Sequence, residues 1–266
     1  MKKRQLNYTA NSYVKLNKNM QHKLAQNHAL RIYNSNSIYS FIPKNGCSTM
    51  RLSLALANGC ISDPKDFEWI HNNSLTFSAD LPSLLLADYT FVILRCPFAR
   101  LASVYLDKIV STTWIRRSLQ NMLKGKLESD EMTFRVFVKS LIHNETLRHN
   151  IHWRPQTDFL VYKEYDDYFN LENFSFAKDT IESKTHINIV DARNLTRHGI
   201  DSFILNSDSS YADYLVEDLQ KLKRNGQAPQ PSALYDDELI TLVQNIYKED
   251  ISLYKCFFGN ENLMFS

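Results

Sequence analysis

Glycine is scarce in this chain, with only 6 among its 266 residues. The glycines lie at positions 46, 59, 125, 199, 226 and 259, and no two are closer than 13 residues. This spacing excludes the G-x-G-x-x-G loop of dinucleotide-binding domains and the G-x-x-x-x-G-K-[ST] loop of P-loop NTPases. The glycine-rich loop of protein kinases is excluded for the same reason.

Cysteine is also rare, and its arrangement excludes several kinds of site. The four cysteines stand at positions 47, 60, 96 and 256, so no C-x-x-C exists for a zinc knuckle or a thioredoxin-type motif. His149 and His152 form H-x-x-H, but H-E-x-x-H is absent. We therefore expect a reduced protein without a bound metal.

Long apolar runs and a strong charge imbalance are absent too. No run approaches the roughly 18–20 residues that a membrane span needs, and no apolar segment follows the basic start of the chain. Lys and Arg number 31 against 29 Asp and Glu, which argues against binding to nucleic acid by phosphate neutralisation. We expect a cytoplasmic protein with no membrane span and no nucleic-acid partner.

Apolar periodicity indicates alternating strands and helices. Short β-prone or apolar runs predict strands at 38–42, 89–95, 158–162 and 187–191. Helical spacing predicts helices at 49–58, 98–109, 113–124, 131–143, 211–223 and 236–254. This order predicts an α/β fold with a central, mostly parallel sheet flanked by helices.

The organisation along the chain suggests a single domain. Residues 1–30 are polar and weakly periodic, and we interpret them as an N-terminal arm before a domain over 31–266. The segment 224–232 has the composition of a linker, but the 34 residues beyond it are too few for an independent core.

The strongest local signal is the segment 41–49, which reads FIPKNGCST. It predicts a strand, a tight turn and a helix start, and backbone N–H groups at such a place form an anion site. Gly46 permits close backbone approach, Lys44 adds a positive charge, and Ser48 and Thr49 supply hydroxyls. The alternative is a plain strand–helix turn with a hydroxyl cap and a solvated lysine.

A second segment places Arg95 at the end of a buried strand and Ser103 in the following helix, 8 positions later. An arginine at the carboxyl end of a strand can bind a second anion with its forked guanidinium. The alternative is that Arg95 pairs with a carboxylate and Ser103 is a small packing residue.

Together, the two segments resemble the cofactor-binding signatures of sulfotransferases that use 3′-phosphoadenylyl sulfate (PAPS). The chain reads PKNGCST and RCPFARLAS where those enzymes carry a 5′-phosphosulfate loop and a 3′-phosphate segment. The resemblance is closest to the carbohydrate sulfotransferases of the Golgi and their bacterial homologues. It extends to HWRPQ at 152–156, which is similar to a segment near their acceptor cleft. The implied fold is P-loop-like.

By this resemblance, six consecutive residues line the 5′ side of PAPS: Lys44, Asn45, Gly46, Cys47, Ser48 and Thr49. Arg95 and Ser103 would bind its 3′-phosphate, and His152 and Trp153 would bind the acceptor. Cys96 departs from the pattern, because an acidic residue usually follows the arginine.

Sulfuryl transfer to a hydroxyl requires a base and positive charge at the leaving phosphate. Lys44 suits the second role, and no metal is then required. His71 is our candidate for the base, because it lies 24 positions before Arg95, in the interval where related enzymes place theirs. Glu68 and His152 remain alternatives.

The resemblance implies transfer of a sulfuryl group from PAPS to a carbohydrate or glycoconjugate hydroxyl. A nucleotide-dependent phosphotransferase and a non-catalytic binding module are the competing hypotheses. Trp153 and Trp114 could stack on a sugar ring, although a core position is the simpler interpretation for most aromatic residues. The basic clusters that could hold an anionic glycan, although solvated positions are simpler, are Arg116, Arg117, Lys221, Lys223 and Arg224. The sequence does not indicate the acceptor or the oligomeric state.

Overall fold

The structure is a computed structural model that describes residues 3–9, 13–73, 75–125, 131–196 and 202–265. The chain divides into two compact units. Unit 1 consists of Met1–Arg95 and Gln156–Arg197, and unit 2 consists of Cys96–Pro155 and His198–Ser266. Each unit is built from two separate stretches of sequence, so the boundary predicted at residue 30 does not coincide with a boundary between them.

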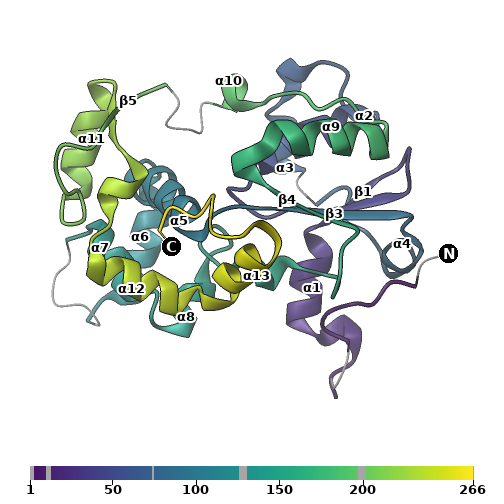
Figure 1. The fold of residues 1–266 in the computed structure, drawn as a ribbon, viewed down its shortest axis with the longest axis horizontal. Coiled ribbons are helices and arrows are strands. Elements are labelled where there is room, and N and C mark those ends of the chain that lie inside the picture. The colour runs from purple at the N-terminus through teal and green to yellow at the C-terminus, as the bar shows by residue number, and fades with distance from the viewer. Residues whose placement is uncertain (1–2, 10–12, 74, 126–130, 197–201, 266) are drawn as a thin grey trace. The chain divides into compact units, whose positions relative to one another are not determined.

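Unit 1 contains a four-stranded sheet in the order β1-β2-β3-β4 (Figure 1). Its strands are β1 (Ala29–Ile32), β2 (Ser37–Ser40), β3 (Tyr89–Leu94) and β4 (Asp167–Asn170). The pair β1–β2 is antiparallel, whereas β2–β3 and β3–β4 are parallel. The prediction of an α/β fold with a mostly parallel sheet and flanking helices is confirmed.

The strand β3 lies inside the sheet, and all six of its residues are buried. A strand covered on both faces is largely apolar, which explains the run YTFVIL. Its buried Thr90 donates its hydroxyl to the carboxylate of Asp166. On one face the ring of Phe91 stacks on Tyr39 at 5.0 Å between centroids and meets Phe169 edge-on at 6.2 Å. These three aromatic side chains connect β2, β3 and β4 across the sheet.

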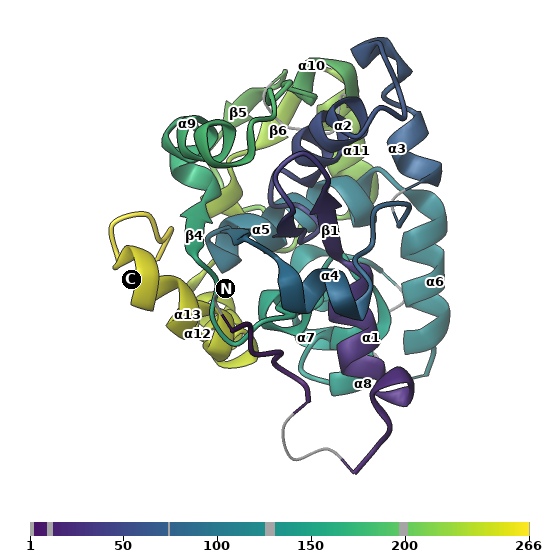
Figure 2. The same cartoon turned by 90° about the vertical axis from the view of Figure 1, so that its right-hand side faces the viewer.

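Helices cover both faces of this sheet. In Figures 1 and 2, α2 and α9 lie on one side of the strands and α1 lies on the other. Met50 and Leu54 of α2 and Ile181 of α9 join the strands in one buried apolar cluster. The helices of unit 1 are η1 (Leu16–Lys18), α1 (Met20–Asn27), α2 (Cys47–Ala57), η2 (Pro64–Asp66), α3 (Trp69–Asn72), α4 (Leu81–Leu86), η4 (Gln156–Phe159), η5 (Leu171–Asn173), α9 (Phe174–Thr185) and α10 (Arg193–Thr196).

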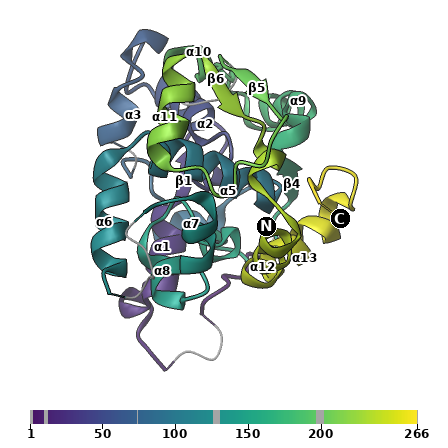
Figure 3. The same cartoon turned by 90° about the vertical axis from the view of Figure 1, so that its left-hand side faces the viewer.

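Unit 2 is mainly helical (Figure 3). Its helices are α5 (Pro97–Val104), the π-helical turn η3 (Tyr105–Val110), α6 (Thr113–Leu123), α7 (Phe134–Ser140), α8 (Asn144–His149), α11 (Val216–Arg224), η6 (Pro231–Leu234), α12 (Asp237–Ile246) and α13 (Lys248–Phe258). Two short parallel strands complete it, β5 (Ile204–Asn206) and β6 (Gln227–Pro229). In its core, the ring of Tyr105 contacts the rings of Phe134 and Phe137.

The strand predicted at 158–162 is wrong. Residues 156–159 form the 3₁₀ turn η4, and Tyr162 makes only an isolated bridge with Leu6. Phe159 is nevertheless fully buried and packs against the ring of His28. A short apolar run identifies a buried segment but does not distinguish a strand from a buried turn.

The strand predicted at 187–191 is also wrong, although Ile187 and Ile189 are buried. The backbone N–H of Ile189 donates to the carboxylate of Glu182, and that of Val190 donates to the hydroxyl of Ser53. Because side chains satisfy these groups, the segment is held without a neighbouring strand. The fourth strand is instead β4, in which Tyr168 and Phe169 favour a strand but the flanking Asp167 and Asn170 do not.

Two predicted helices are interrupted in the structure. The helix expected over 98–109 is α-helical only to Val104 and continues as the π-helical η3. The last helix, expected over 236–254, is divided at Tyr247 into α12 and α13. The Tyr247 hydroxyl donates to the carbonyl of Trp153, which anchors the side chain at the break.

The N-terminal stretch makes specific contacts in unit 1. Arg4 is buried, and its Nη1 lies 2.6 Å from a carboxylate oxygen of Asp166. Its Nε donates to the carbonyl of Ala87. A buried guanidinium needs such partners, so these bonds fix the start of the chain beside β3 and β4.

Candidate functional site

The segment between β2 and α2 forms a tight turn with two residues in the left-handed region. Lys44 has a φ of 73° and Gly46 a φ of 71°. The helix α2 then starts at Cys47, and its first bond runs from the N–H of Met50 to the carbonyl of Gly46. The N–H groups of the three residues before Met50 therefore have no acceptor within the helix. Such a helix start suits an anion.

Gly46 is required here for two separate reasons. Its positive φ is unfavourable for any residue with a side chain. A Cβ at this position would also lie 2.9 Å from Cδ1 of Leu171, the first residue of η5. The turn therefore packs so closely against its neighbour that only glycine fits without displacement.

A buried hydrogen-bond network joins the turn to Arg95. The amide of Asn45 donates to Oε1 of Gln156 at 2.6 Å and to the carbonyl of Ile93 at 2.9 Å. The same Gln156 oxygen accepts the N–H of Arg95 at 3.0 Å, and Nε2 of Gln156 donates to the Arg95 carbonyl at 2.9 Å. One buried glutamine thus holds both predicted phosphate-binding segments in unit 1.

The guanidinium of Arg95 contacts the turn directly. Its Nη1 donates to the carbonyl of Lys44 at 2.9 Å. Both side chains are half-buried, so each retains an accessible portion. Asn45 is fully buried, and Oδ1 of its side chain has no hydrogen-bond partner among the described residues. The side chain of Asn45 therefore acts within the network of the turn.

The remaining residues of the turn begin α2. Cys47 and Ser48 are half-buried, whereas Thr49 is nearly buried and its hydroxyl accepts the N–H of Ala192. One turn further, the Ser53 hydroxyl donates to the Thr49 carbonyl. Thr49 thus has a structural contact besides its predicted role towards the 5′-phosphosulfate.

Ser103 lies in α5, which begins two residues after Arg95. Its side chain is half-buried. Arg95 belongs to unit 1 and Ser103 to unit 2, so the assignment of Ser103 to the same phosphate stays a prediction.

Two candidates for the base lie on or beside the short helix α3. His71 is exposed within α3, and Glu68 is exposed directly before it. Arg51 of α2 donates to the carbonyl of Ile70, which ties α3 to the helix that carries the turn.

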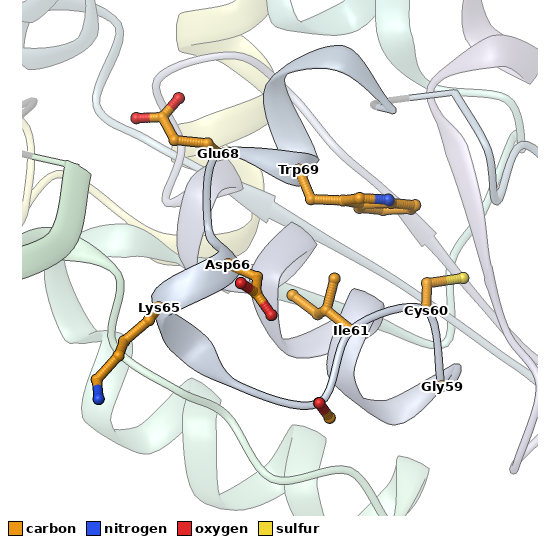
Figure 4. A pocket seen from close by; sticks show the side chains of 8 residues that line it. Gly59, Cys60, Ile61, Lys65, Asp66, Glu68 and Trp69 are labelled. Atoms are coloured by element: carbon orange, nitrogen blue, oxygen red, sulfur yellow. The ribbon is translucent and has the colours of Figure 1, made fainter.

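An open hollow of about 690 Å³ lies beside α3 (Figure 4). The ring of Trp69 and the side chain of Ile61 supply apolar surface, while Glu68 points away from Trp69. Of the two base candidates in this region, Glu68 lines the hollow and His71 does not.

The residues of the segment HWRPQ differ in their surroundings. Nδ1 of His152 lies 2.7 Å from Oδ1 of Asn150; a proton on Nδ1 makes Nε2 the basic nitrogen of the ring. Trp153 is completely buried, and its indole N–H donates to the carbonyl of Thr146. This burial argues against Trp153 as a side chain that contacts a sugar. The third tryptophan, Trp114, is exposed in unit 2.

Arg100 also has a structural partner. Its side chain is buried, and Nη1 donates to the carbonyl of Arg154 in the same unit. This contact gives Arg100 a structural role within unit 2.

The comparison with protein families decides the assignment. A model described as the sulfotransferase family matches residues 27–257, which is most of the chain. The chain belongs to the sulfotransferase family. The match includes the turn at 43–49, Arg95 and the segment 152–156.

A curated relative supports the same assignment over a shorter stretch. This sulfotransferase-family chain is 30% identical over 156 residues to carbohydrate sulfotransferase 14 of Danio rerio. The alignment covers 51% of the chain and 41% of the relative, so the chain spans less than half the length of that protein. No solved structure matches the chain, and the P-loop-like description of its fold stays a prediction.

Gln156 is the residue of this sulfotransferase-family site that the sequence analysis did not assign. It lies 111 positions after Asn45 and 61 after Arg95, so no local spacing connects them. The signal that could have identified it is the last letter of HWRPQ, a segment interpreted only as part of the acceptor side.

The described residues hold nitrogen donors that suit phosphate better than a metal. Within them, no group of three or more His, Cys, Asp or Glu side chains is placed to hold a metal ion. The start of α2, the Lys44 ammonium and the Arg95 guanidinium are all donors or cations. Across the described ranges, no helix is long and apolar enough to cross a membrane.

Proposed function

We propose that this chain transfers a sulfuryl group from PAPS to a hydroxyl of a carbohydrate or glycoconjugate. Membership of the sulfotransferase family supports the reaction class. The observation that carries the proposal is the network of Asn45, Arg95 and Gln156, because it holds two cationic, donor-rich segments together. The name of the relative, carbohydrate sulfotransferase 14, supports the acceptor class.

The residues present fit the donor. PAPS supplies the activated sulfuryl group and carries anionic groups at its 5′ and 3′ positions. We assign the 5′ side to Lys44 and the N–H groups of Cys47 and Ser48 at the start of α2. We assign the 3′-phosphate to the guanidinium of Arg95, with Ser103 as its predicted partner.

Lys44 has the central electrostatic role in this proposal. Lys44 lies on the turn that leads into the start of α2. We infer that its ammonium and the helix start oppose negative charge at one locus. Together with Arg95, these groups supply the positive charge that a divalent metal provides in many phosphate-binding enzymes. We therefore propose that transfer requires no metal.

We propose His71 as the base that accepts the hydroxyl proton of the acceptor, with Glu68 and His152 as alternatives. A neutral imidazole accepts a proton near neutral pH, which suits His71 and His152. Replacing the true base with a residue that cannot accept a proton should lower kcat by about 10²–10⁴-fold. The three variants His71→Ala, Glu68→Gln and His152→Ala, compared over a pH series, identify it.

The direct test is transfer of a labelled sulfuryl group from PAPS to a panel of carbohydrates, with and without EDTA. We expect transfer that persists in EDTA and that falls about 10²-fold or more in Lys44→Ala. Lys23→Ala, which removes an exposed lysine of α1, is the matched control and should retain activity. Magnesium-dependent phosphoryl transfer from ATP in place of sulfuryl transfer would support the phosphotransferase alternative.

A further inference from the structure

A second open hollow, of about 670 Å³, lies on unit 2 beside the first half of α6. The proposed chemistry at Lys44 and Arg95 makes no use of it. Six of its lining residues are relevant to binding: Ser111, Thr113, Trp114, Arg117, Ser118 and Asn121. Apart from the aromatic ring, these side chains supply hydroxyls, an amide and a guanidinium.

The helix α6, seen at the right of Figure 2, has one buried and one exposed face. Ile115, Leu119 and Leu123 recur at every fourth position and are buried against unit 2. Trp114 and Asn121 lie on the opposite, exposed face, with Arg117 and Ser118 between them. The hollow is therefore lined by the face of α6 that the core does not use.

Trp114 is the unusual member of this face, because its side chain is 70% exposed. By contrast, Trp153 is fully buried and Trp69 is half-buried. Trp114 makes no ring contact or hydrogen bond with another described residue. An exposed indole that lacks such contacts and has polar neighbours offers a flat apolar surface to a ligand.

The charge around the hollow is positive. Arg117 is exposed and forms no ion pair within the described part of the chain. Nζ of Lys223 donates to the Ser111 hydroxyl at 2.6 Å, which brings a second cation to the rim. No carboxylate is among the described lining residues, and the nearby Asp107 is paired with Lys108.

We propose that this hollow binds an acidic saccharide, with a sugar ring stacked on Trp114 and its anionic group on Arg117. The apolar C–H face of a sugar ring matches an indole, and a guanidinium binds a carboxylate or sulfate through paired hydrogen bonds. Ser118 and Asn121 are placed to bind sugar hydroxyls. The inference rests on the proposed carbohydrate acceptor and specifies that it carries negative charge.

The test measures shielding of Trp114 from acrylamide by a hyaluronan tetrasaccharide, which carries carboxylates. Neutral chitotetraose serves as the uncharged comparison. Subtracting the emission of Trp114→Phe isolates the signal of Trp114. We expect saturable shielding by hyaluronan and at least about fivefold weaker binding of chitotetraose.

Variants separate the two contacts. Trp114→Ala should weaken binding of the hyaluronan tetrasaccharide, measured by calorimetry, by about tenfold. Arg117→Gln should remove the preference for the acidic saccharide. Phe176→Ala removes an equally exposed ring from unit 1, and Lys248→Gln removes an exposed charge from α13; both should bind as the parent does.

Absence of shielding, or equal binding of the acidic and neutral saccharides, would overturn the proposal. Shielding that depends on protein concentration instead of saccharide would indicate contact between copies and would overturn it as well. Binding of adenosine 3′,5′-bisphosphate is measured on the same proteins. If the bisphosphate binds but the saccharide does not, this inference fails and the proposed function stands; the reverse result rejects the proposed function alone.

Discussion

Gln156 is the side chain whose loss should damage the candidate site most specifically. It is buried and bonds to the side chain of Asn45 and to the backbone of Arg95. Gln156→Ala removes these three hydrogen bonds, at a cost of about 2–3 kcal/mol in the free energy of unfolding. Because the turn and Arg95 then lose their link, binding of adenosine 3′,5′-bisphosphate should weaken by about tenfold.

Denaturant unfolding and calorimetry measure the two effects of Gln156→Ala. Gln21→Ala, which removes an exposed glutamine of α1, is the control for both measurements. Unchanged bisphosphate binding in Gln156→Ala would show that the network does not position the phosphate-binding groups.

Gly46 provides a second test at the scale of one residue, because Gly59 is a matched control. Both have positive φ, but a Cβ at Gly59 meets nothing within 4 Å, whereas at Gly46 it meets Leu171 at 2.9 Å. Gly59→Ala should cost about 1 kcal/mol through backbone strain alone. Gly46→Ala should cost somewhat more than this, because Cδ1 at the end of the Leu171 side chain must also move aside. Equal losses in thermal unfolding would argue against the close packing of the turn.

The sequence indicated the residues of the turn and Arg95, because each set is contiguous and its chemistry is local. It did not indicate what holds them together. The role of Gln156 depends on a contact across 111 positions to Asn45, and no periodicity reports such a contact. Burial of Trp153 was equally hidden, since a tryptophan next to a histidine is compatible with a core or a cleft.

The helix α1 contains a pH-sensitive group, His22. Its side chain is buried, its Nδ1 has no hydrogen-bond partner among the described residues, and burial lowers the pKa of its imidazole. The unfolded chain therefore binds a proton at His22 more readily than the folded chain does. The contribution of neutral His22 to the free energy of unfolding is fully present above the pKa of a histidine in the unfolded chain, about 6.5. This contribution decreases as the pH falls below that value.

Urea unfolding at a series of pH values measures this effect of α1. We expect the free energy of unfolding to fall from about pH 7.5 to about pH 5.5 less steeply in His22→Gln than in the parent. The difference between the two proteins at each pH cancels the contributions of other groups. Parallel curves would contradict a role for His22.

Helices and strands were predicted correctly where the apolar pattern was long. They were predicted wrongly where residues distant in the sequence hold a segment in place. The buried run of β3 and the helices α2, α6 and α11 follow from apolar periodicity. The apolar segment 187–191 was assigned to a strand because its burial was clear, but side chains of other elements bind its N–H groups. The break at Tyr247 has no glycine or proline to mark it.

The whole molecule consists of two compact units, and the residues of the predicted site are distributed between them. Lys44, Arg95 and His71 belong to unit 1, whereas Ser103 and His152 belong to unit 2. The chain passes from one unit to the other directly after Arg95 and returns at Gln156, which are the two residues bonded to each other. The network therefore also joins, within unit 1, the residues at two of the points where the chain crosses between the units.

The central claim is that the turn at Lys44 and the guanidinium of Arg95 form one site for a nucleotide with two anionic ends. Calorimetric titration with adenosine 3′,5′-bisphosphate tests it most directly, with Lys44→Ala and Arg95→Ala beside the parent protein. Adenosine 5′-monophosphate, which lacks the 3′-phosphate, and ATP with and without magnesium are the comparisons.

We expect magnesium-independent binding that favours the bisphosphate over both comparison nucleotides and weakens about tenfold or more in each variant. In Arg95→Ala, the preference for the bisphosphate over the monophosphate should largely disappear. Magnesium-dependent binding of ATP without binding of the bisphosphate would contradict the account.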